Sequence, residues 1–233
     1  MDKDFFRFPS TPHIQWLGAE LPRDDKLLTA QEVKLLFSSE VQIEEKIDGA
    51  NLGISFDKEG NIQAQNRGQY LLKPYMGQFE NLEVWLATRE NELFDLLGEH
   101  LILFGEWCAA KHSIGYEQLP DWFLVFDVYD RHAEMFWSTS RRNRLAKKMG
   151  LKVVPQVWQG RTQIKQVLKQ LEAQKSAFTD ESAEGFIIRK DNSDWLEMRG
   201  KIVRAEFVQN IGVHWSKQKL EWNQIDWASA YDC

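Results

Sequence analysis

The sequence predicts an α+β protein in which strands dominate the middle of the chain and helices lie between them. One reason is that apolar and polar residues alternate from 41 to 43 and again from 52 to 56, which is typical of half-buried strands. Another is that apolar residues follow helical spacing in 78–98 and in 162–175. These patterns favour antiparallel strands flanked by helices. The chain shows neither an internal repeat nor a low-complexity linker.

Turn signals join the predicted strands into hairpins. Residues 57–61 (DKEGN) are typical of a turn between the strand 52–56 and a returning strand at 62–64, and Arg67 follows just beyond that strand. A second hairpin is predicted from 122–129 and 134–137. The remaining predicted strands are 101–107, 185–189 and 194–208.

Helix ends are predicted from capping residues. Thr29, with a glutamate three positions later, is typical of a helix start, and Ser140 is placed at the start of a helix that Gly150 closes. Residues 1–23 contain three of the six prolines, so extended chain and turns are expected there. The tryptophan-rich segment that begins at His214 is expected to be helical or irregular.

The composition is that of a globular protein. Hydrophobic residues make up 43% of the chain and charged residues 27%, which are ordinary values. No apolar run approaches the roughly 20 residues of a membrane span, and no signal peptide is recognised, so no membrane contact is expected. The net charge of −6 argues against a general polyanion binder but allows one local basic surface.

Two cysteines, Cys108 and Cys233, offer no disulfide framework. Reduced thiols in the cytoplasm are the simplest interpretation. Cys108 and His112 form a C-x3-H pair, which we interpret as packing rather than a zinc site because no second pair of ligands follows.

Lys46 is the first candidate for chemistry. It lies where a predicted strand ends, with the turn residues Asp48 and Gly49 just behind it. A lysine that faces a pocket from a strand end can lose solvation and gain cationic neighbours, and both lower its pKa and free the amine as a nucleophile. The alternative is a surface lysine beside a tight turn.

Polar residues at other strand ends could hold a nucleoside triphosphate against Lys46. Phosphoryl transfer requires neutralised phosphate charge, a metal and little else from the protein. Glu106 and Glu184 could bind Mg²⁺ or ribose hydroxyls, and Phe126 could stack on a base. Solvated carboxylates and a core phenylalanine are the alternatives. Candidate cations for the phosphates are Arg67, Arg199, Lys201 and Arg204.

The most basic segment lies on the helix predicted to start at Ser140. It contains five cations and no acid. Such a run is usually a solvated helix face, and the absence of acids also fits contact with nucleic acid. The five residues are Arg141, Arg142, Arg144, Lys147 and Lys148.

The order of these pieces resembles the covalent nucleotidyltransferase superfamily of ATP-dependent RNA and DNA ligases and mRNA capping enzymes. It is most similar to the RNA ligases that seal nicks in double strands. Residues 46–49 (KIDG) look like the K-x-D-G nucleophile motif of this superfamily. The other similar segments are 104–106 (FGE), 126–129 (FDVY), 184–188 (EGFII) and 196–204 (LEMRGKIVR). The resemblance covers about residues 40 to 206, and 8–13 (FPSTPH) also looks like a segment of bacterial members.

This resemblance implies the ATP-grasp-like nucleotidyltransferase fold and three successive in-line transfers. Lys46 would attack the α-phosphate of ATP, AMP would pass to an RNA 5′-phosphate, and a 3′-hydroxyl would displace it. Glu184 would help to hold Mg²⁺ or Mn²⁺. Arg199 and Lys201 would stabilise charge on the α-phosphate. In the other register of that motif, Glu197 and Arg199 take these two places.

For the nucleotide itself, the resemblance implies adenine stacked on Phe126 and ribose bound by Glu106. Glu44, or the main chain of Glu45, would read the adenine edge. The phosphate and the incoming 5′ end would lie near Asn51 and Arg67. Contacts to RNA are expected from Arg67, Arg141, Arg142, Arg144, Lys147, Lys148 and Arg204.

The protein expected from the sequence is therefore an ATP-dependent RNA ligase that forms one domain over residues 1–233 and acts in RNA repair. Only 27 residues follow Glu206, so neither an OB-fold nor another C-terminal domain is expected, and a partner protein could deliver or heal the RNA ends. One alternative is a DNA ligase or another AMP transferase of the same fold. A second is a nucleotide- or RNA-binding module that has lost ligation.

Overall fold

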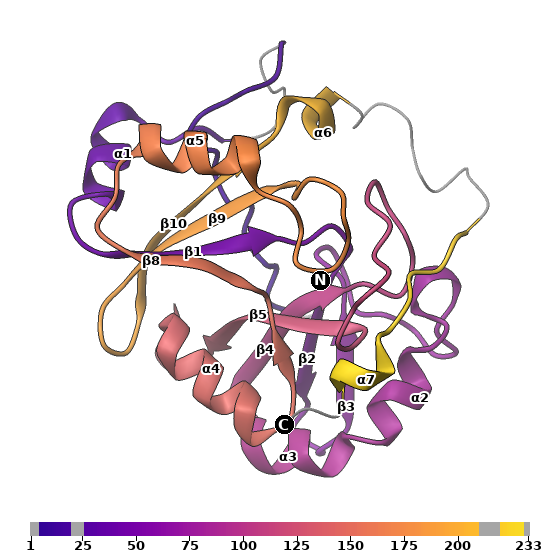
Figure 1. Cartoon of the computed structure of the whole chain (residues 1–233). Coiled ribbons are helices and arrows are strands. Elements are labelled where there is room, and N and C mark those ends of the chain that lie inside the picture. The colour runs from indigo at the N-terminus through magenta and orange to yellow at the C-terminus, as the bar shows by residue number, and fades with distance from the viewer. Residues whose placement is uncertain (1–4, 20–25, 210–219, 231–233) are drawn as a thin grey trace.

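The computed structural model describes residues 5–19, 26–209 and 220–230, and its strands form two sheets (Figure 1). The smaller sheet is antiparallel, in the order β10 (Leu196–Val203), β9 (Gly185–Asp191), β1 (Val41–Lys46), β8 (Gln156–Gly160). The larger sheet has the order β3 (Ile62–Gln65), β2 (Ala50–Phe56), β4 (Leu101–Trp107), β5 (Phe123–Asp130), β6 (Met135–Phe136), and β7 (Lys152–Val153) runs parallel to β5. The predicted α+β class with antiparallel sheets is confirmed.

Helices cover one face of each sheet (Figure 1). The smaller sheet packs against α1 (Ala30–Leu36) and α5 (Ile164–Ala173) in one buried apolar cluster. The larger sheet packs against α2 (Leu82–Ala87), α3 (Glu90–Leu97) and α4 (Thr139–Lys148) in another. Shorter helical pieces are η1 (Gly77–Phe79), α6 (Ala205–Gln209) and α7 (Trp227–Ala230). No described helix has the length and apolar character needed to span a membrane.

The two faces of the larger sheet are both covered. Leu52 and Ile54 alternate onto the face beneath the helices. On the neighbouring strand, Ile102 and Phe104 alternate onto the opposite face, where they pack with Phe8 of the N-terminal segment. The sheet is therefore more deeply buried than the half-buried pattern predicted from the sequence, and the N-terminal segment supplies the second cover.

The helix predicted over 78–98 is interrupted. It is broken after α2, where the Thr88 hydroxyl donates a hydrogen bond to the main-chain carbonyl of Trp85 over 3.0 Å. Arg89 lies over the Trp85 ring and pairs with Asp121 over 3.0 Å. These contacts hold Arg89 outside the helical register, so that α3 starts afresh at Glu90.

Two other boundaries differ from the prediction. α4 starts earlier than expected because Ser138, not Ser140, has the extended backbone of a helix cap, and its hydroxyl accepts from the main-chain N–H of Arg141. The strand predicted over 194–208 ends at Val203, where the chain turns into α6.

The N-terminal segment 5–19 contains no helix, as predicted. It runs beside the edge strand β10, where the Lys201 N–H donates to the Pro12 carbonyl and the Ile14 N–H donates to the Lys201 carbonyl, each over 2.8 Å. This pairing holds Lys201 and brings Thr11 to the space between the two sheets. The other residues of 1–23, and 214–219 and 231–233 of the tryptophan-rich segment, lie outside the described residues.

Candidate active site

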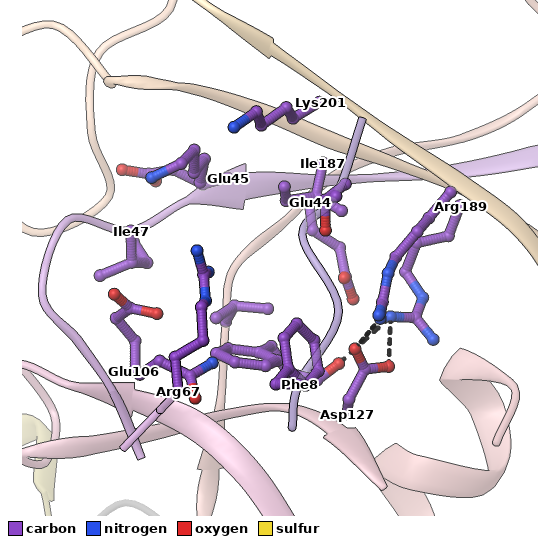
Figure 2. Close-up of a pocket in the computed structure, with 16 residues that line it drawn as sticks. Phe8, Glu44, Glu45, Ile47, Arg67, Glu106, Asp127, Ile187, Arg189 and Lys201 are labelled. Carbon is purple, nitrogen blue, oxygen red and sulfur yellow. Dashed lines mark hydrogen bonds and ion pairs between the residues drawn. The ribbon is translucent and has the colours of Figure 1, made fainter. Parts of the chain in front are cut away.

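A cavity lies between the two sheets, with a volume of about 740 Å³ when its opening to solvent is included (Figure 2). Lys201 and Glu45 reach it from the smaller sheet, and Glu106 and Asp127 reach it from the larger sheet. The residues of the predicted catalytic and nucleotide-binding set that line it are Glu44, Glu45, Lys46, Asn51, Arg67, Glu106, Phe126, Arg199 and Lys201.

Lys46 is the last residue of β1 and lies inside this cavity. It pairs across the sheet with Gly185 of β9, which brings Glu184 next to it. The Lys46 Nζ donates a hydrogen bond to Glu184 Oε2 over 2.6 Å, and 26% of the lysine side chain is exposed. The structure therefore favours the pocket interpretation of Lys46 over that of a surface lysine. It also brings Glu184, which does not itself line the cavity, to the candidate nucleophile.

The charge around Lys46 is opposite in sign to the prediction. Burial alone lowers its pKa, but the carboxylates of Glu184, Glu106 and Asp48 outweigh burial and raise the pKa above its ordinary value. The expectation of cationic neighbours and a lowered pKa is therefore wrong. The reason is that the strand ends meeting at Lys46 carry acids, so the amine is held as an ammonium ion.

Asp48 and Gly49 fix the turn that follows Lys46. Asp48 Oδ2 accepts hydrogen bonds from the N–H groups of Ser113 (2.6 Å) and Ile114 (3.1 Å). A Cβ atom on Gly49 would lie 2.7 Å from the Trp107 carbonyl oxygen, so only glycine fits this approach of the turn to β4. Both residues therefore position Lys46 and do not face the cavity.

Glu106 connects the same turn to β4. Its Oε1 accepts a hydrogen bond from the Gly49 N–H over 3.1 Å. Burial raises the pKa of Glu106 to about 7, although the Lys46 ammonium acts in the opposite direction. A carboxyl group with this pKa is partly protonated at neutral pH, which gives it both donor and acceptor capacity toward a hydroxyl-bearing ligand.

The raised pKa of Glu106 predicts a pH-dependent stability. The folded protein binds this proton more tightly than the unfolded chain, whose carboxyl has an ordinary pKa near 4.5, so stability falls as the pH rises from 4.5 to 7. Glu106→Gln removes this loss. We expect the variant to match the wild type at pH 4 and to exceed it at pH 8 by no more than about 3 kcal/mol in urea unfolding.

The matched control is Glu83→Gln, because Glu83 is about half exposed in its pair with Lys73. It should show no such pH-dependent gain. A difference between Glu106→Gln and the wild type that stays constant from pH 4 to pH 8 would contradict the raised pKa.

β10 presents two cations to the cavity. Arg199 and Lys201 line it, and they lie opposite Arg189 and Ile187 of β9 in the strand register. Glu197 lies outside, 41% exposed, and pairs with a lysine of β9. The structure therefore favours Arg199 and Lys201 over the register that would place Glu197 at the phosphate.

Two buried oxygen atoms in the wall remain available to a ligand. Asn51 Oδ1 and Glu45 Oε1 accept no hydrogen bond from any residue that the structure describes. The other carboxylate oxygen of Glu45 accepts from the Ala177 N–H over 2.9 Å, which fixes the side chain. Because a buried acceptor without a partner is costly, these atoms fit polar groups of a bound molecule.

Glu44 and Arg142 contact each other, whereas contacts to the adenine edge and to the RNA were predicted. The two form a buried ion pair in which Arg142 Nη2 lies 2.5 Å from Glu44 Oε1 and Nη1 lies 3.3 Å from Oε2. Arg142 is fully buried, so its prediction as an RNA contact is wrong. Its helix turns that side inward because α4 packs on the larger sheet. Glu44 lines the cavity, but both of its carboxylate oxygens already face Arg142.

Arg204 is also committed to the protein interior. Its guanidinium donates to the main-chain carbonyls of Leu171 and Gln174 at the end of α5, and its Nε donates to Ala183. These contacts tie the end of α5 to the segment that precedes β9, so the structure does not favour the prediction that Arg204 contacts RNA.

The remaining basic residues of α4 divide into two groups. The Arg141 guanidinium lies over the rings of Trp137 (3.8 Å) and Trp195 (4.8 Å). The exposed cations are Arg144, Lys147 and Lys148. These three residues are the part of the predicted basic surface that faces solvent, and we call them the α4 basic patch.

Apart from three aliphatic residues, four cavity residues were not predicted as site residues. Phe8 and Thr11 come from the N-terminal segment, and Asp127 and Arg189 come from β5 and β9. The resemblance of 8–13 to bacterial members of the nucleotidyltransferase superfamily was a signal for the first two. Asp127 lies inside a quoted motif. Arg189 directly follows one, and its pairing with Asp127 over 2.7 Å depends on strand register, which the sequence does not give.

The acids beside Lys46 fit a divalent metal that binds together with a nucleotide. Among the described residues, no group of three or more His, Cys, Asp or Glu side chains is arranged to hold a metal ion. Mg²⁺ in nucleotide sites commonly takes one or two carboxylates, and phosphate oxygens and water complete its shell. Glu184 and Glu106 supply such carboxylates, because both lie close enough to Lys46 to raise the pKa of its amine.

The sequence matches the profile of the RNA ligase family over residues 39–203, more than half of the chain. The chain belongs to the RNA ligase family. The match spans all the residues of the RNA ligase motifs that reach the cavity, from Lys46 to Lys201. A comparison with curated proteins found no match.

Solved RNA ligases share the fold. A variant of Naegleria gruberi RNA ligase with ATP and Mn superposes with a TM-score of 0.61 at 16% identity, over 88% of this chain and 58% of that one. The same ligase with pyrophosphate gives 0.61 at 17%, over 88% and 63%. An archaeal ATP-dependent RNA ligase gives 0.60 at 18%, over 85% and 48%. The chain thus spans about half to three-fifths of the length of these ligases.

Proposed function

We propose that this protein is an ATP-dependent RNA ligase that joins 3′-hydroxyl and 5′-phosphate ends through AMP bound covalently to Lys46. The observation that carries the proposal is the placement of the Lys46 amine. It lies in the cavity between the two sheets, against the acids Glu184 and Glu106, with Arg199 and Lys201 in the same walls. Membership of the RNA ligase family supports the same assignment.

The proposed reaction consists of three in-line transfers. Lys46 Nζ loses a proton and forms a bond to the α-phosphorus of ATP, and the bond from that phosphorus to the bridging oxygen breaks, releasing pyrophosphate. An oxygen of the RNA 5′-phosphate then forms a bond to the same phosphorus and Lys46 leaves. Finally, the RNA 3′-hydroxyl attacks the 5′-phosphate and AMP leaves. The Lys46–Glu184 ion pair must open first, because an ammonium ion is no nucleophile.

The cavity residues take roles that their positions suit. Phe126 provides a ring surface for adenine, and Glu45 Oε1 accepts from the exocyclic amino group of the base. We assign this contact to the side chain because Glu45 Oε1 is a buried acceptor that has no hydrogen-bond partner among the described residues. Glu106 binds a ribose hydroxyl. Asn51 and Arg67 lie with the phosphates and the incoming 5′ end.

The negative charge of the phosphates is balanced by two side-chain cations and by a metal ion. Arg199 and Lys201 stabilise the α-phosphate. Glu184 would hold Mg²⁺ or Mn²⁺ together with the phosphate oxygens, and the metal would supply charge neutralisation during transfer. The proposed biological role is repair of nicked or broken structured RNA in the cytoplasm, with a partner protein that delivers or heals the ends.

A sealing assay tests the proposal. Duplexes that carry a single nick with a 5′-phosphate, and with either a ribose or a deoxyribose at the 3′ end, are incubated with the protein, ATP and Mg²⁺. We expect ATP-dependent sealing of the ribose nick. Sealing of the deoxyribose nick alone would make the protein a DNA ligase, and the absence of both sealing and AMP transfer would reduce it to a binding module.

The α4 basic patch is expected to contact the RNA backbone. Replacing Arg144, Lys147 and Lys148 by glutamate should weaken RNA binding and make it less dependent on salt, by roughly 0.7–0.9 in the log–log slope for each phosphate that the protein no longer neutralises. AMP transfer from ATP to the protein should be unchanged. Filter binding over a range of NaCl concentrations measures the affinity and its salt dependence.

The matched control changes three exposed lysines on α1 and α5, which cover the smaller sheet. The same charge reversal at Lys34, Lys165 and Lys169 should leave the salt slope close to that of the wild type. If both triple variants bind RNA equally, the basic patch is an ordinary solvated helix face.

A further inference from the structure

The strand that carries Phe126 has a bulge at that residue. In the pairing of β4 with β5, Phe104 lies opposite Asp127 and Gly105 lies opposite Val125, so Phe126 has no partner on β4. A bulge leaves one residue out of the ladder and re-aims its side chain. Here it turns the partly buried Phe126 ring to the cavity.

The partner strand is adapted to this bulge. A Cβ atom on Gly105 would lie 2.4 Å from the Phe123 ring and 2.7 Å from the Leu124 carbonyl oxygen. Only glycine fits at this position without displacing β5. The bulge is therefore built by both strands, and it creates a main-chain carbonyl at Phe126 that needs another partner.

Two buried arginines supply that partner. Arg142 Nη1 donates to the Phe126 carbonyl oxygen over 2.6 Å, and Arg189 Nη1 donates to it over 3.3 Å. Both side chains are almost completely buried, at 0% and 1% exposure. Each is neutralised by an acid that lines the cavity, Glu44 for Arg142 and Asp127 for Arg189. Figure 2 shows Asp127, Arg189 and Phe8 together at this end of the cavity.

The arginines also stiffen the surroundings of the ring. Arg142 comes from α4 and Arg189 from the smaller sheet, so the carbonyl joins three separate elements. Phe8 packs at a steep angle to Phe126, with the ring centroids 5.3 Å apart, which limits rotation of the ring. A buried charge is expensive unless it is paired, so the ion pairs with Glu44 and Asp127 keep the two arginines at this carbonyl.

We propose that Arg142 and Arg189 are positioning residues of the nucleotide site. They hold the bulged carbonyl of Phe126, and through it they set the plane on which the base of the nucleotide stacks. This inference rests on the proposed function, because it takes Phe126 as the base-stacking residue. It adds a role for two arginines that never touch the nucleotide.

A double-mutant cycle with AMP as the ligand tests the inference. The variant Glu44→Gln/Arg142→Gln removes both charges of the pair together, which avoids an unpaired buried charge. The dissociation constant of AMP is measured by calorimetry for the wild type, this variant, Phe126→Ala and the triple variant. Loss of base stacking should raise the constant for Phe126→Ala by roughly 5- to 150-fold.

The charge-pair variant should raise the AMP dissociation constant about 10-fold in the presence of Phe126 and less than about 2-fold in its absence, because coupled sites are not additive. An equal effect in both backgrounds, or no effect in either, overturns the inference. If the charge-pair variant does not fold, Arg142→Lys replaces it in the same cycle. A lysine keeps the charge balance with Glu44 but lacks the fork that reaches both Glu44 and the carbonyl.

Two further measurements separate the possible causes. Leu171→Ala removes a buried side chain of α5 away from the cavity, so it should lower thermal stability without changing AMP affinity. A change there would show that stability alone controls binding and would overturn the inference. If the wild type binds neither AMP nor ATP, the proposed function fails first. If the wild type binds and the cycle is additive, only the positioning role fails.

Discussion

Lys46→Met is expected to abolish transfer of AMP from ATP to the protein, by roughly 10⁴-fold or more. The reason is that the amine at the end of β1 is the atom that forms the bond to phosphorus, and no neighbouring group can replace it there. Lys201 also lines the cavity, but it is held on the edge strand by the N-terminal segment. The measurement uses α-labelled ATP, Mg²⁺ and gel autoradiography of the protein.

The control for this result is Lys190→Met. Lys190 pairs with Glu197 over 3.3 Å on the far side of β9 from the cavity lining, so its loss should leave AMP transfer unchanged. Lys201→Met should slow the transfer and still yield the labelled adduct. If Lys46→Met becomes labelled at the wild-type rate, the nucleophile is another residue and the proposed site is wrong.

Asp127→Asn is expected to destabilise the fold by about 3–5 kcal/mol. The Asp127 carboxylate lies between two arginines, since Oδ1 accepts from Arg189 over 2.7 Å and Oδ2 accepts from Arg199. Both the acid and Arg189 are about 1% exposed, so the neutral side chain leaves Arg199 without this counter-ion and Arg189 with only the longer pair to Asp191 at 3.9 Å. Asn keeps the size and shape of the residue, so the loss reports on charge. Urea unfolding at pH 7 measures it.

The comparison for Asp127 is the exposed pair of Lys73 and Glu83, in which each side chain is 55% exposed. Glu83→Gln should change the free energy of unfolding by less than about 1 kcal/mol, because solvent screens surface pairs. Equal losses in the two variants would mean that the Asp127 network is no stronger than an ordinary surface contact.

The sequence predicted well those features that repeat along the chain or that obey local turn chemistry. The alternation before and after Lys46 placed two strands and the turn between them, and the structure has both strands and the lysine in a cavity. The helix at Thr29 starts as predicted, because the capping pair with Glu32 is complete within four residues. Such signals depend on neighbours in sequence alone.

The charge around the site could not be predicted in this way. The expectation for Lys46 assumed that cations from other strands would surround it, but the acids Glu184 and Glu106 raise its pKa more than any cation lowers it. Which strand ends meet at one point depends on sheet order, and β1 lies between β8 and β9 although these strands are far from it in sequence. The sign of the pKa shift follows from that order.

Helix facing and strand register account for the other errors. Arg142 and Arg144 look alike in the basic run, yet one is buried against Glu44 and the other is exposed, because α4 packs one side onto the larger sheet. The bulge at Phe126 falls within a continuous apolar strand, where no alternation marks a change of face. Only the pairing with β4 reveals it, and with it the reason why this ring faces the cavity.

The most direct test of the account is to locate the AMP adduct. The purified protein is incubated with ATP and Mg²⁺, digested, and its peptides are sequenced by mass spectrometry. The account predicts a mass increase of one AMP on Lys46 and on no other residue. An adduct on a different side chain, or none in a preparation that seals nicked RNA with ATP, would contradict it.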